Sequence, residues 1–419
     1  MRTESTRNRI NLCRMGLLLG LVAFAYGSTV TASAAPASAL KIGLLMDYST
    51  GNEEAVRNRQ RAFELAIKHV NQGGGVLGQP VEFAIGDTTR NPEKAVAEAR
   101  RLVEVEGVHA IVGPNSSANA LPVAERVIGP AGIPTITFSA TSPRLTAAAD
   151  HDFLFRTAVS DIAQGPVLAR ITRERGVDNV GLLYVDDAWG RGLAGAFKAA
   201  WAGKVKAVAF DRQQAGFVGP LRESASEGAQ ALVVIAFASA AEKIVREAIE
   251  HGIYRLFTFG DSAKRERLVR SLGGTRLGGM FGSGGGTGTS VVTASSRAWD
   301  AAYIAEHGAL PVLAYVREAY DATVALALAA QAAGSLDGAA IRDRLRAVGA
   351  APGTTVTAGP QGVADALRIL ADGEEIDYEG AAVTMDWDEN GDLRRGHVGI
   401  WRFTGDERIE EVGAVPYER

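Results

Sequence analysis

Short apolar runs alternate with amphipathic stretches along most of this chain, and this alternation limits the possible folds more than any other feature of the sequence. The apolar runs have the length of buried strands, and the amphipathic stretches carry apolar residues at helical spacing. Strands that alternate with helices are typical of parallel sheets with helices on both faces. Because the alternation occurs in two series, from residue 40 and from about residue 161, we expect an α/β protein with two doubly wound, parallel-sheet lobes.

Several helix starts support this division into elements. Asn91 is a capping residue, and Pro92 and Glu93 follow it in the first turn of an expected helix. Further helices are expected over 119–127 and 164–175. The expected strands lie at 40–46, 81–85, 110–112 and 134–138 in the first series and at 180–185, 205–210, 231–235 and 256–259 in the second.

The last third of the chain departs from this pattern. The glycine-rich stretch 278–288 reads as a connection, and a long alanine-rich helix is expected over 311–333. Asn390-Gly391 is a strong turn signal, so that the runs 383–387 and 399–403 are predicted to form a hairpin. The small residues of 354–370 allow no interpretation.

The N-terminus has the pattern of a secretory signal peptide. Four arginines precede a short apolar run, and small residues with an A-x-A cleavage pattern follow it, so residues 1–34 are predicted to be removed. The alternative is a membrane anchor, but the run is short for a bilayer span. Cys13, the single cysteine, would leave with this leader. We therefore expect an exported, soluble periplasmic protein without thiols.

Charge and motifs exclude several function classes. The 44 basic and 48 acidic side chains are mixed along the chain, without the long basic block that is typical of nucleic-acid binding. The six histidines form no zinc-ligand pattern, and neither a phosphate-binding loop nor a nucleophile elbow occurs. The segment 386–391 matches half of a calcium loop, but His397 stands where a glutamate is needed. An acidic turn is the better interpretation, and we expect neither metal nor cofactor.

Polar segments follow three of the expected strands. In open parallel sheets, ligands bind beyond the carboxyl ends of the strands. The segments 113–117 and 139–143 offer hydroxyls and backbone N–H groups, whereas 260–262 offers the carboxylate of Asp261. Such a set suits a zwitterion, although each segment alone is also compatible with an ordinary capping or turn sequence.

Several motifs in a fixed order resemble the leucine/isoleucine/valine-binding family of periplasmic solute receptors, which serve ABC importers. The resemblance covers nearly all of the chain beyond the leader, and its motifs include 41–45, 66–71, 73–78, 87–93, 112–117, 139–143, 320–322 and 386–392. It implies a type I periplasmic-binding fold, in which three crossovers join two lobes around a ligand cleft. The implied first lobe comprises 40–159 and 284–383, and the second comprises 160–283 and 384–419.

The same resemblance assigns roles to individual residues. Ser117 and Thr141 would hold a ligand carboxylate, and the Ser139 carbonyl and Asp261 would hold an ammonium group. Ser116 and Ala140 would line the same loops, Trp189 would form a wall of the cleft in the second lobe, and Tyr48 would contact the ligand from the first loop. The alternative for Trp189 is a core aromatic, and the surroundings of Asp261 depart from the family pattern.

The expected function is therefore binding without chemistry. A small polar molecule, most simply an amino acid, would enter the cleft, and the closed receptor would dock on the permease subunits of an ABC importer. One alternative is a sensor that delivers its signal through a separate partner. The other is an enzyme that uses paired carboxylates.

Overall fold

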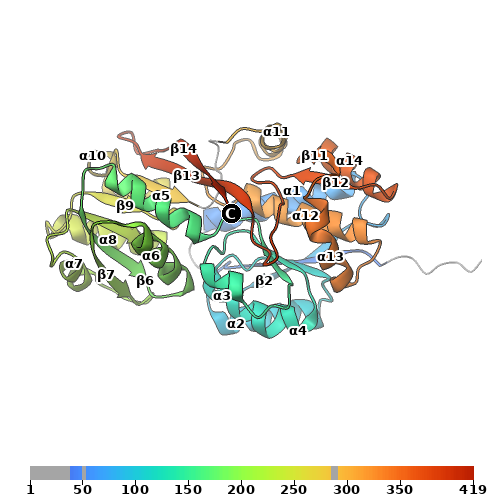
Figure 1. Ribbon diagram of the computed structural model, residues 1–419, viewed down its shortest axis with the longest axis horizontal. Coiled ribbons are helices and arrows are strands. Elements are labelled where there is room, and N and C mark those ends of the chain that lie inside the picture. The colour runs from blue at the N-terminus through green and yellow to red at the C-terminus, as the bar shows by residue number, and fades with distance from the viewer. Residues whose placement is uncertain (1–37, 50–52, 285–290) are drawn as a thin grey trace, which may run out of the picture. The chain divides into compact units, whose positions relative to one another are not determined.

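The computed structural model describes residues 38–49, 53–284 and 291–419. The predicted signal peptide, 1–34, lies outside the described residues, as does part of the predicted glycine-rich connection. Two main sheets organise the described residues: one of five strands and one of seven (Figure 1). We call the five-stranded sheet with the helices that cover it the first lobe, and the seven-stranded sheet with its helices the second lobe.

The first sheet has the order β2-β1-β3-β4-β5, and all of its strands are parallel. Both faces are covered, because alternate residues of one strand enter different cores: Leu44 packs with α1 and α12, whereas Leu45 packs with α2 and α3. This burial on both faces explains the uninterrupted apolar runs. The strands are β1 (Lys41–Met46), β2 (Glu82–Asp87), β3 (Ala110–Val112), β4 (Thr135–Thr137) and β5 (Leu154–Arg156).

The helices of the first half follow the predicted starts. Asn91 accepts hydrogen bonds from the backbone N–H groups of Glu93 and Lys94 at 2.9 and 3.1 Å, which confirms the predicted cap. The helices are α1 (Glu53–Gln72), α2 (Pro92–Glu104), α3 (Ser117–Val123), a π-helical turn (Ala124–Ile128) and α4 (Gly129–Ala131).

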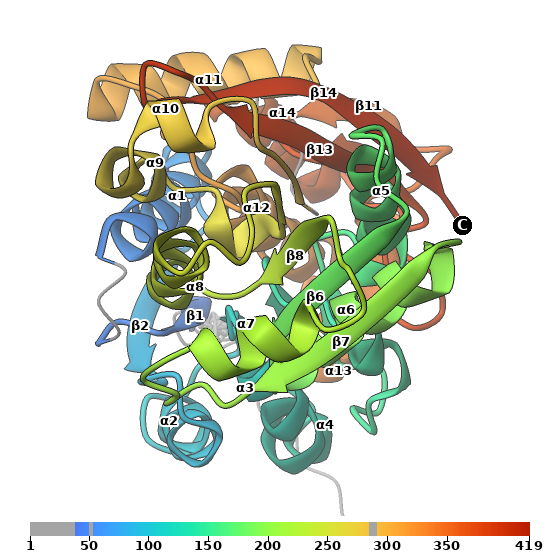
Figure 2. The ribbon, with the colours of Figure 1, turned by 90° about the vertical axis from the view of Figure 1, so that its left-hand side faces the viewer.

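The second sheet has the order β14-β13-β10-β9-β8-β6-β7. Helices α5 and α6 pack together on one face of it, and α7, α8 and α9 cover the other (Figure 2). Its strands are β6 (Asn179–Val185), β7 (Lys204–Phe210), β8 (Ala231–Ile235), β9 (Phe257–Phe259), β10 (Phe281–Gly284), β13 (Arg395–Phe403) and β14 (Ile409–Glu418). Its helices are α5 (Asp161–Arg173), α6 (Ala188–Ala200), α7 (Val218–Ser224), α8 (Ala238–Glu250), α9 (Glu266–Leu272) and α10 (Gly274–Leu277).

The chain returns to the first lobe after β10 and leaves it again before β13. The returning segment contains α11 (Ala294–His307), α12 (Arg317–Ala333), α13 (Gly338–Val348), β11 (Thr354–Thr357), α14 (Pro360–Ala371) and β12 (Ile376–Glu379). Met385, Trp387 and Leu393 still belong to the core of the first lobe. The predicted lobe boundaries remain a proposal, and this packing favours placing the last one just before Arg395.

Two expectations for the last third of the chain are wrong. The run 399–403 lies in β13, which pairs with β14 and not with 383–387 (Figure 1). The Asn390-Gly391 turn closes only a short bridge between Trp387 and Leu393. The glycine-rich stretch contains β10, which pairs with β13. The Trp401 ring lies so close to Gly282 that an added Cβ would be 2.1 Å from it. Glycine is required there by packing, not by flexibility.

No single helix of the described residues is long and apolar enough to cross a membrane. The helices α12 and α13 pass this test only as a pair, and they are bent by 110° at their junction. Nearly every residue of α12 is buried in the core of the first lobe, which explains its apolar composition.

Candidate functional site

The site lies where the strand order of both sheets reverses. In the first sheet the strand that follows β1 in the sequence and the strand that follows β3 are added on opposite sides of this pair. The same holds for β6 and β8 in the second sheet. Such switch points leave a crevice beyond the carboxyl ends of the strands. The loops after β1, β3 and β4 of the first lobe and after β6, β8 and β9 of the second line one shared cavity of about 700 Å³. This volume is typical of sites for small molecules.

Five of the eight predicted site residues line this cavity: Ser116, Ser117, Ser139, Trp189 and Asp261. They come from both lobes, as the resemblance implied, and their contact with a ligand remains a prediction.

The other three predicted residues, Tyr48, Ala140 and Thr141, are not part of the cavity lining. Tyr48 packs against the core of the first lobe. Ala140 and Thr141 are buried beneath the loop, and the Ala140 N–H points to the Thr137 hydroxyl at 3.3 Å. A ligand contact by any of the three is a prediction without geometric support in this arrangement.

The polar groups of the first lobe are well placed by their own hydrogen bonds. The Ser117 hydroxyl accepts a bond of 3.1 Å from the backbone N–H of Ser142, so its own proton is available to a ligand. The Ser139 hydroxyl donates to the Asn115 carbonyl at 2.9 Å and ties the two loops together. Ser116 stands at the start of α3 without capping it by its side chain, which leaves that hydroxyl to the cavity.

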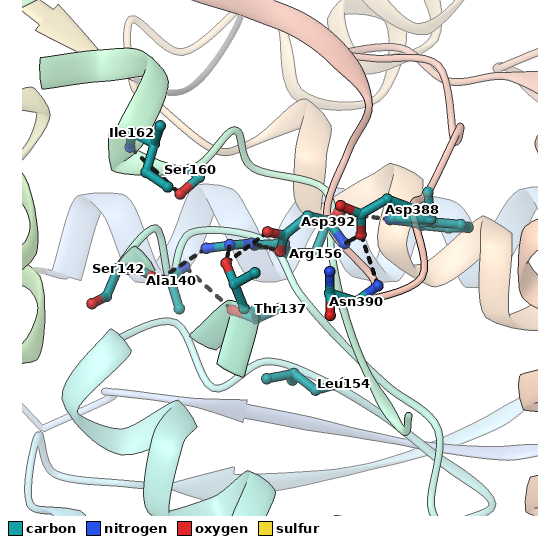
Figure 3. Close-up of polar contacts among 12 residues, drawn as sticks. Thr137, Ala140, Ser142, Leu154, Arg156, Ser160, Ile162, Asp388, Asn390 and Asp392 are labelled. Carbon is teal, nitrogen blue, oxygen red and sulfur yellow. Dashed lines mark hydrogen bonds and ion pairs between the residues drawn. The ribbon is translucent and has the colours of Figure 1, made fainter. Parts of the chain in front are cut away.

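A buried ion pair supports the second of these loops from behind (Figure 3). Arg156 donates to the Ser142 carbonyl at 3.0 Å and pairs with Asp392 at 2.5 Å. Asp388 belongs to the predicted acidic turn and Asp392 directly follows it; Asp388 accepts hydrogen bonds from the N–H groups of Asn390 and Asp392. Arg419 pairs with both carboxylates at 2.9 and 3.0 Å. The acidic turn thus serves to anchor the loop 139–142.

Asp261 is a buried carboxylate with one unused oxygen. It is 4% exposed, and its Oδ2 accepts a hydrogen bond from the Tyr315 hydroxyl at 2.9 Å. Its Oδ1 has no hydrogen-bond partner. Burial raises the pKa of Asp261, and the Tyr315 bond opposes that rise. A cationic group of a ligand would satisfy the unused oxygen and keep the carboxylate ionised.

A second carboxylate, Asp161, lies near Asp261. It is fully buried at the start of α5, and neither of its oxygens has a hydrogen-bond partner. Burial, followed by the charge of Asp261, raises the pKa of Asp161 well above its ordinary value. The charge of Asp261 thus disfavours ionisation of its buried neighbour Asp161.

Sequence reasoning missed the cationic side of the cavity. Arg59, Arg90 and Arg265 line it, and Arg90 pairs with Asp47 at 3.1 Å. The sequence did contain an indication for Arg59, because this charged residue occupies the apolar face of α1 between Val56 and Phe63. A charged residue at such a position is unusual and indicates a partner or a cavity.

Aromatic rings complete the wall of the cavity. Trp189 and Phe237 lie with their ring centroids 5.0 Å apart. Arg90 of the first lobe is stacked over the Phe237 ring at 4.8 Å, which is a contact between the lobes. The Ser142 hydroxyl also donates across the cleft to the Ala188 carbonyl, at 2.7 Å. The lobes thus contact each other at the rim of the cavity.

Among the described residues there is no group of three or more His, Cys, Asp or Glu side chains that could hold a metal ion. The hydroxyls of one lobe and the carboxylate of the other line the same cavity, and together they suit a molecule that carries both an anionic and a cationic group.

Comparisons with known proteins show the family of this chain. The family described as periplasmic binding protein matches residues 39–365. A Leu/Ile/Val-binding protein homolog 3 of Brucella melitensis is 27% identical over 392 residues, 92% of this chain and 96% of that protein. The chemotactic signal transduction system substrate-binding protein BasB of Halobacterium salinarum is 27% identical over 338 residues, 78% of each chain.

Solved structures show the same fold. The leucine binding protein LivK of Thermotoga maritima superposes with a TM-score of 0.73 at 22% identity, covering 90% of this chain and 98% of that one. LivJ of Streptococcus pneumoniae, in complex with isoleucine, has a TM-score of 0.73 at 23% identity and covers 90% and 100%. The fold is therefore the type I periplasmic-binding fold, and the chain belongs to the periplasmic binding protein family, within which its resemblance to the Leu/Ile/Val-binding proteins is confirmed.

Proposed function

We propose that this protein is the extracytoplasmic receptor of an ABC importer and that it binds an amino acid or a similar small polar molecule between its lobes. The observation that carries the proposal is the shared cavity, in which Ser117 and Ser139 face the same space as Asp261. The hydroxyls and neighbouring N–H groups of the first lobe suit a carboxylate, and the free oxygen of Asp261 suits an ammonium.

The mechanism requires no covalent step. Ligand favours the closed arrangement because it contacts both lobes at once, and a molecule that contacted only one lobe would not shift the equilibrium. The closed receptor would then dock on the permease subunits and release its ligand there. The relatives named for Leu/Ile/Val binding support an amino acid as the cargo.

A ligand screen tests this proposal directly. The purified protein would be heated with each amino acid, and a ligand at 100 times its dissociation constant raises the unfolding free energy by about 2.7 kcal/mol. Asp261→Asn should abolish the shift produced by an amino acid. Asp178→Asn, an exposed aspartate of the second lobe, is the matched control and should keep it. No shift with any amino acid would refute an amino acid as the ligand.

A sensor role is the second candidate, because one relative is named as part of a chemotactic signal transduction system. The binding step would be the same, and only the partner would differ. Co-purification from membranes in the presence of the ligand separates the two roles. A permease as the captured partner supports import, and a transmembrane signalling receptor supports sensing.

A further inference from the structure

The cavity contains two buried arginines that the binding of a neutral amino acid does not explain. Arg59 of α1 is 7% exposed and Arg265, just before α9, is 8% exposed. Both line the cavity, one from each lobe. Within the described residues, neither guanidinium forms an ion pair with a carboxylate, although surface arginines of this chain commonly do.

Their hydrogen bonds leave donors unused. Arg59 donates through Nη2 to the Ala314 carbonyl at 3.2 Å, and Arg265 donates through Nη1 to the Lys264 carbonyl at 2.7 Å. The Nε–H of each is buried without a partner. An unsatisfied buried donor on a charged group is costly, and more so than on a neutral one.

The two charges also act on each other. Burial, followed by the charge of Arg59, lowers the pKa of Arg265 to about 10. Arg265 is still protonated at neutral pH, and a guanidinium keeps its charge in proteins, so two like charges line the same cavity. Burial lowers the pKa of Arg59, and Tyr315, Asp261 and Glu318 oppose that fall without forming an ion pair with the guanidinium. An anion between the guanidiniums would satisfy the free donors and remove the repulsion.

Two aromatic rings hold the Arg59 side chain in place. The Arg59 guanidinium lies 5.9 Å from the centre of the Phe138 ring and 5.7 Å from that of Tyr315. A planar cation held between two rings has lost its conformational freedom before ligand arrives, which lowers the entropic cost of binding. The Arg59 guanidinium is therefore preorganised for binding an anion, unlike a mobile arginine on the surface.

We propose that Arg59 and Arg265 form a second anion subsite, and that the ligand is an amino acid whose side chain ends in a carboxylate. This inference rests on the proposed function, since the Ser117 hydroxyl takes the α-carboxylate and the Asp261 carboxylate takes the ammonium. The side-chain carboxylate of aspartate or glutamate then bridges the two guanidiniums. Bidentate pairing of this kind discriminates strongly against a neutral isostere.

Calorimetric titration of the unchanged protein with glutamate, glutamine, aspartate, asparagine and leucine tests the inference. An acidic amino acid should bind at least about 100-fold more tightly than its amide, because the amide leaves both guanidiniums unpaired. Arg265→Met should reduce this ratio to about one. Arg270→Met, an exposed arginine of α9 outside the cavity lining, should leave the ratio unchanged.

The outcomes separate the two proposals. Equal binding of glutamate and glutamine, or tighter binding of leucine, would overturn the second anion subsite and leave the amino-acid receptor standing. Glutarate, which lacks the amine, binding as tightly as glutamate would support the arginine subsite and refute the ammonium site at Asp261. Because the ratio is measured first on the unchanged protein, misfolding of Arg265→Met would not remove the test.

Discussion

The hydroxyl of Tyr315 and the carboxylate of Asp261 are joined by a hydrogen bond of 2.9 Å that connects the first lobe to the second. Tyr315 packs in the core of the first lobe, and its backbone has a φ of 66°, in the left-handed region that aromatic residues rarely adopt. Such a conformation persists only where the surroundings impose it, and it is frequent at ligand sites. The bond therefore sets the position and the proton affinity of Asp261 from the opposite lobe.

Tyr315→Phe should make binding of an amino acid more sensitive to acid. The Tyr315 bond opposes the rise that burial produces in the pKa of Asp261, so its removal raises that pKa further. An ammonium group binds the ionised carboxylate, and affinity is lost as the pH falls through this pKa. The measurement is the dissociation constant of the tightest amino acid as a function of pH, and the loss should begin at a higher pH in the variant.

Tyr184→Phe is the control for this experiment, because Tyr184 lies on β6 and outside the cavity lining. It should reproduce the pH profile of the unchanged protein. An identical profile for Tyr315→Phe would contradict a role of Asp261 as the anion that binds the ligand amine.

Arg156→Met should destabilise the protein and loosen the loop 139–142. The substitution leaves the buried Asp392 with Arg419 as its remaining cation, and breaking a buried ion pair costs about 3–5 kcal/mol. Urea unfolding should show a loss of about 3 kcal/mol, and ligand affinity should fall because the Ser142 carbonyl loses its donor. Arg144→Met, on an exposed arginine nearby, should change neither quantity. A loss below about 1 kcal/mol would contradict an anchoring role for this pair.

The sequence sufficed for the strands and helices whose apolar pattern is set by burial on both sides. β1, β6 and β8 lie at the predicted positions, and each is longer than four residues and largely buried. The edge strands β2 and β7 are partly exposed and also lie where they were predicted. β5, a strand of three residues that ends in Arg156, was missed, whereas β3, β4 and β9 are equally short and were predicted. β10 was hidden because its glycines accommodate Trp401, a contact that only the folded chain creates.

The polar loops of the candidate site could be predicted because they follow strands, and the carboxyl ends of parallel strands meet at one edge. The side-chain directions could not. Thr141 resembles Ser139 in the sequence, but the structure buries it completely. The sequence contained no indication for Arg265, because the residues around it are polar and its burial is created only by the folded chain.

Acid should destabilise the protein through His69. This residue is 3% exposed, and its Nδ1 lies 2.7 Å from the Tyr320 hydroxyl. Burial lowers the pKa of His69 from 6.5 to about 4. The unfolded chain therefore binds a proton that the folded protein does not bind between these values, and the free energy of unfolding falls as the pH decreases from about 6.5 to about 4.

The experiment compares urea unfolding of His69→Gln with that of the unchanged protein at pH 7 and pH 4.5. The pH-dependent loss should be smaller in the variant, by on the order of 2 kcal/mol. His251→Gln, at an exposed histidine that ends α8, should retain the full loss. Parallel pH profiles for the unchanged protein and His69→Gln would show that other groups cause the acid sensitivity.

Gly192 of α6 should control how closely the lobes approach. A Cβ at this position would lie 2.7 Å from Pro143 and 3.1 Å from the Ser142 hydroxyl, both of which belong to the first lobe, so a larger side chain opposes the closed arrangement. Gly192→Val should weaken ligand binding by at least about tenfold while leaving the fold intact, because only the closed form contacts the ligand from both sides. Gly195→Val, on the same helix with nothing within 4 Å of the added Cβ, carries the same cost in helix propensity and should bind normally. Calorimetry of both variants decides the matter: equal affinities would mean that closure at this contact does not contribute to binding.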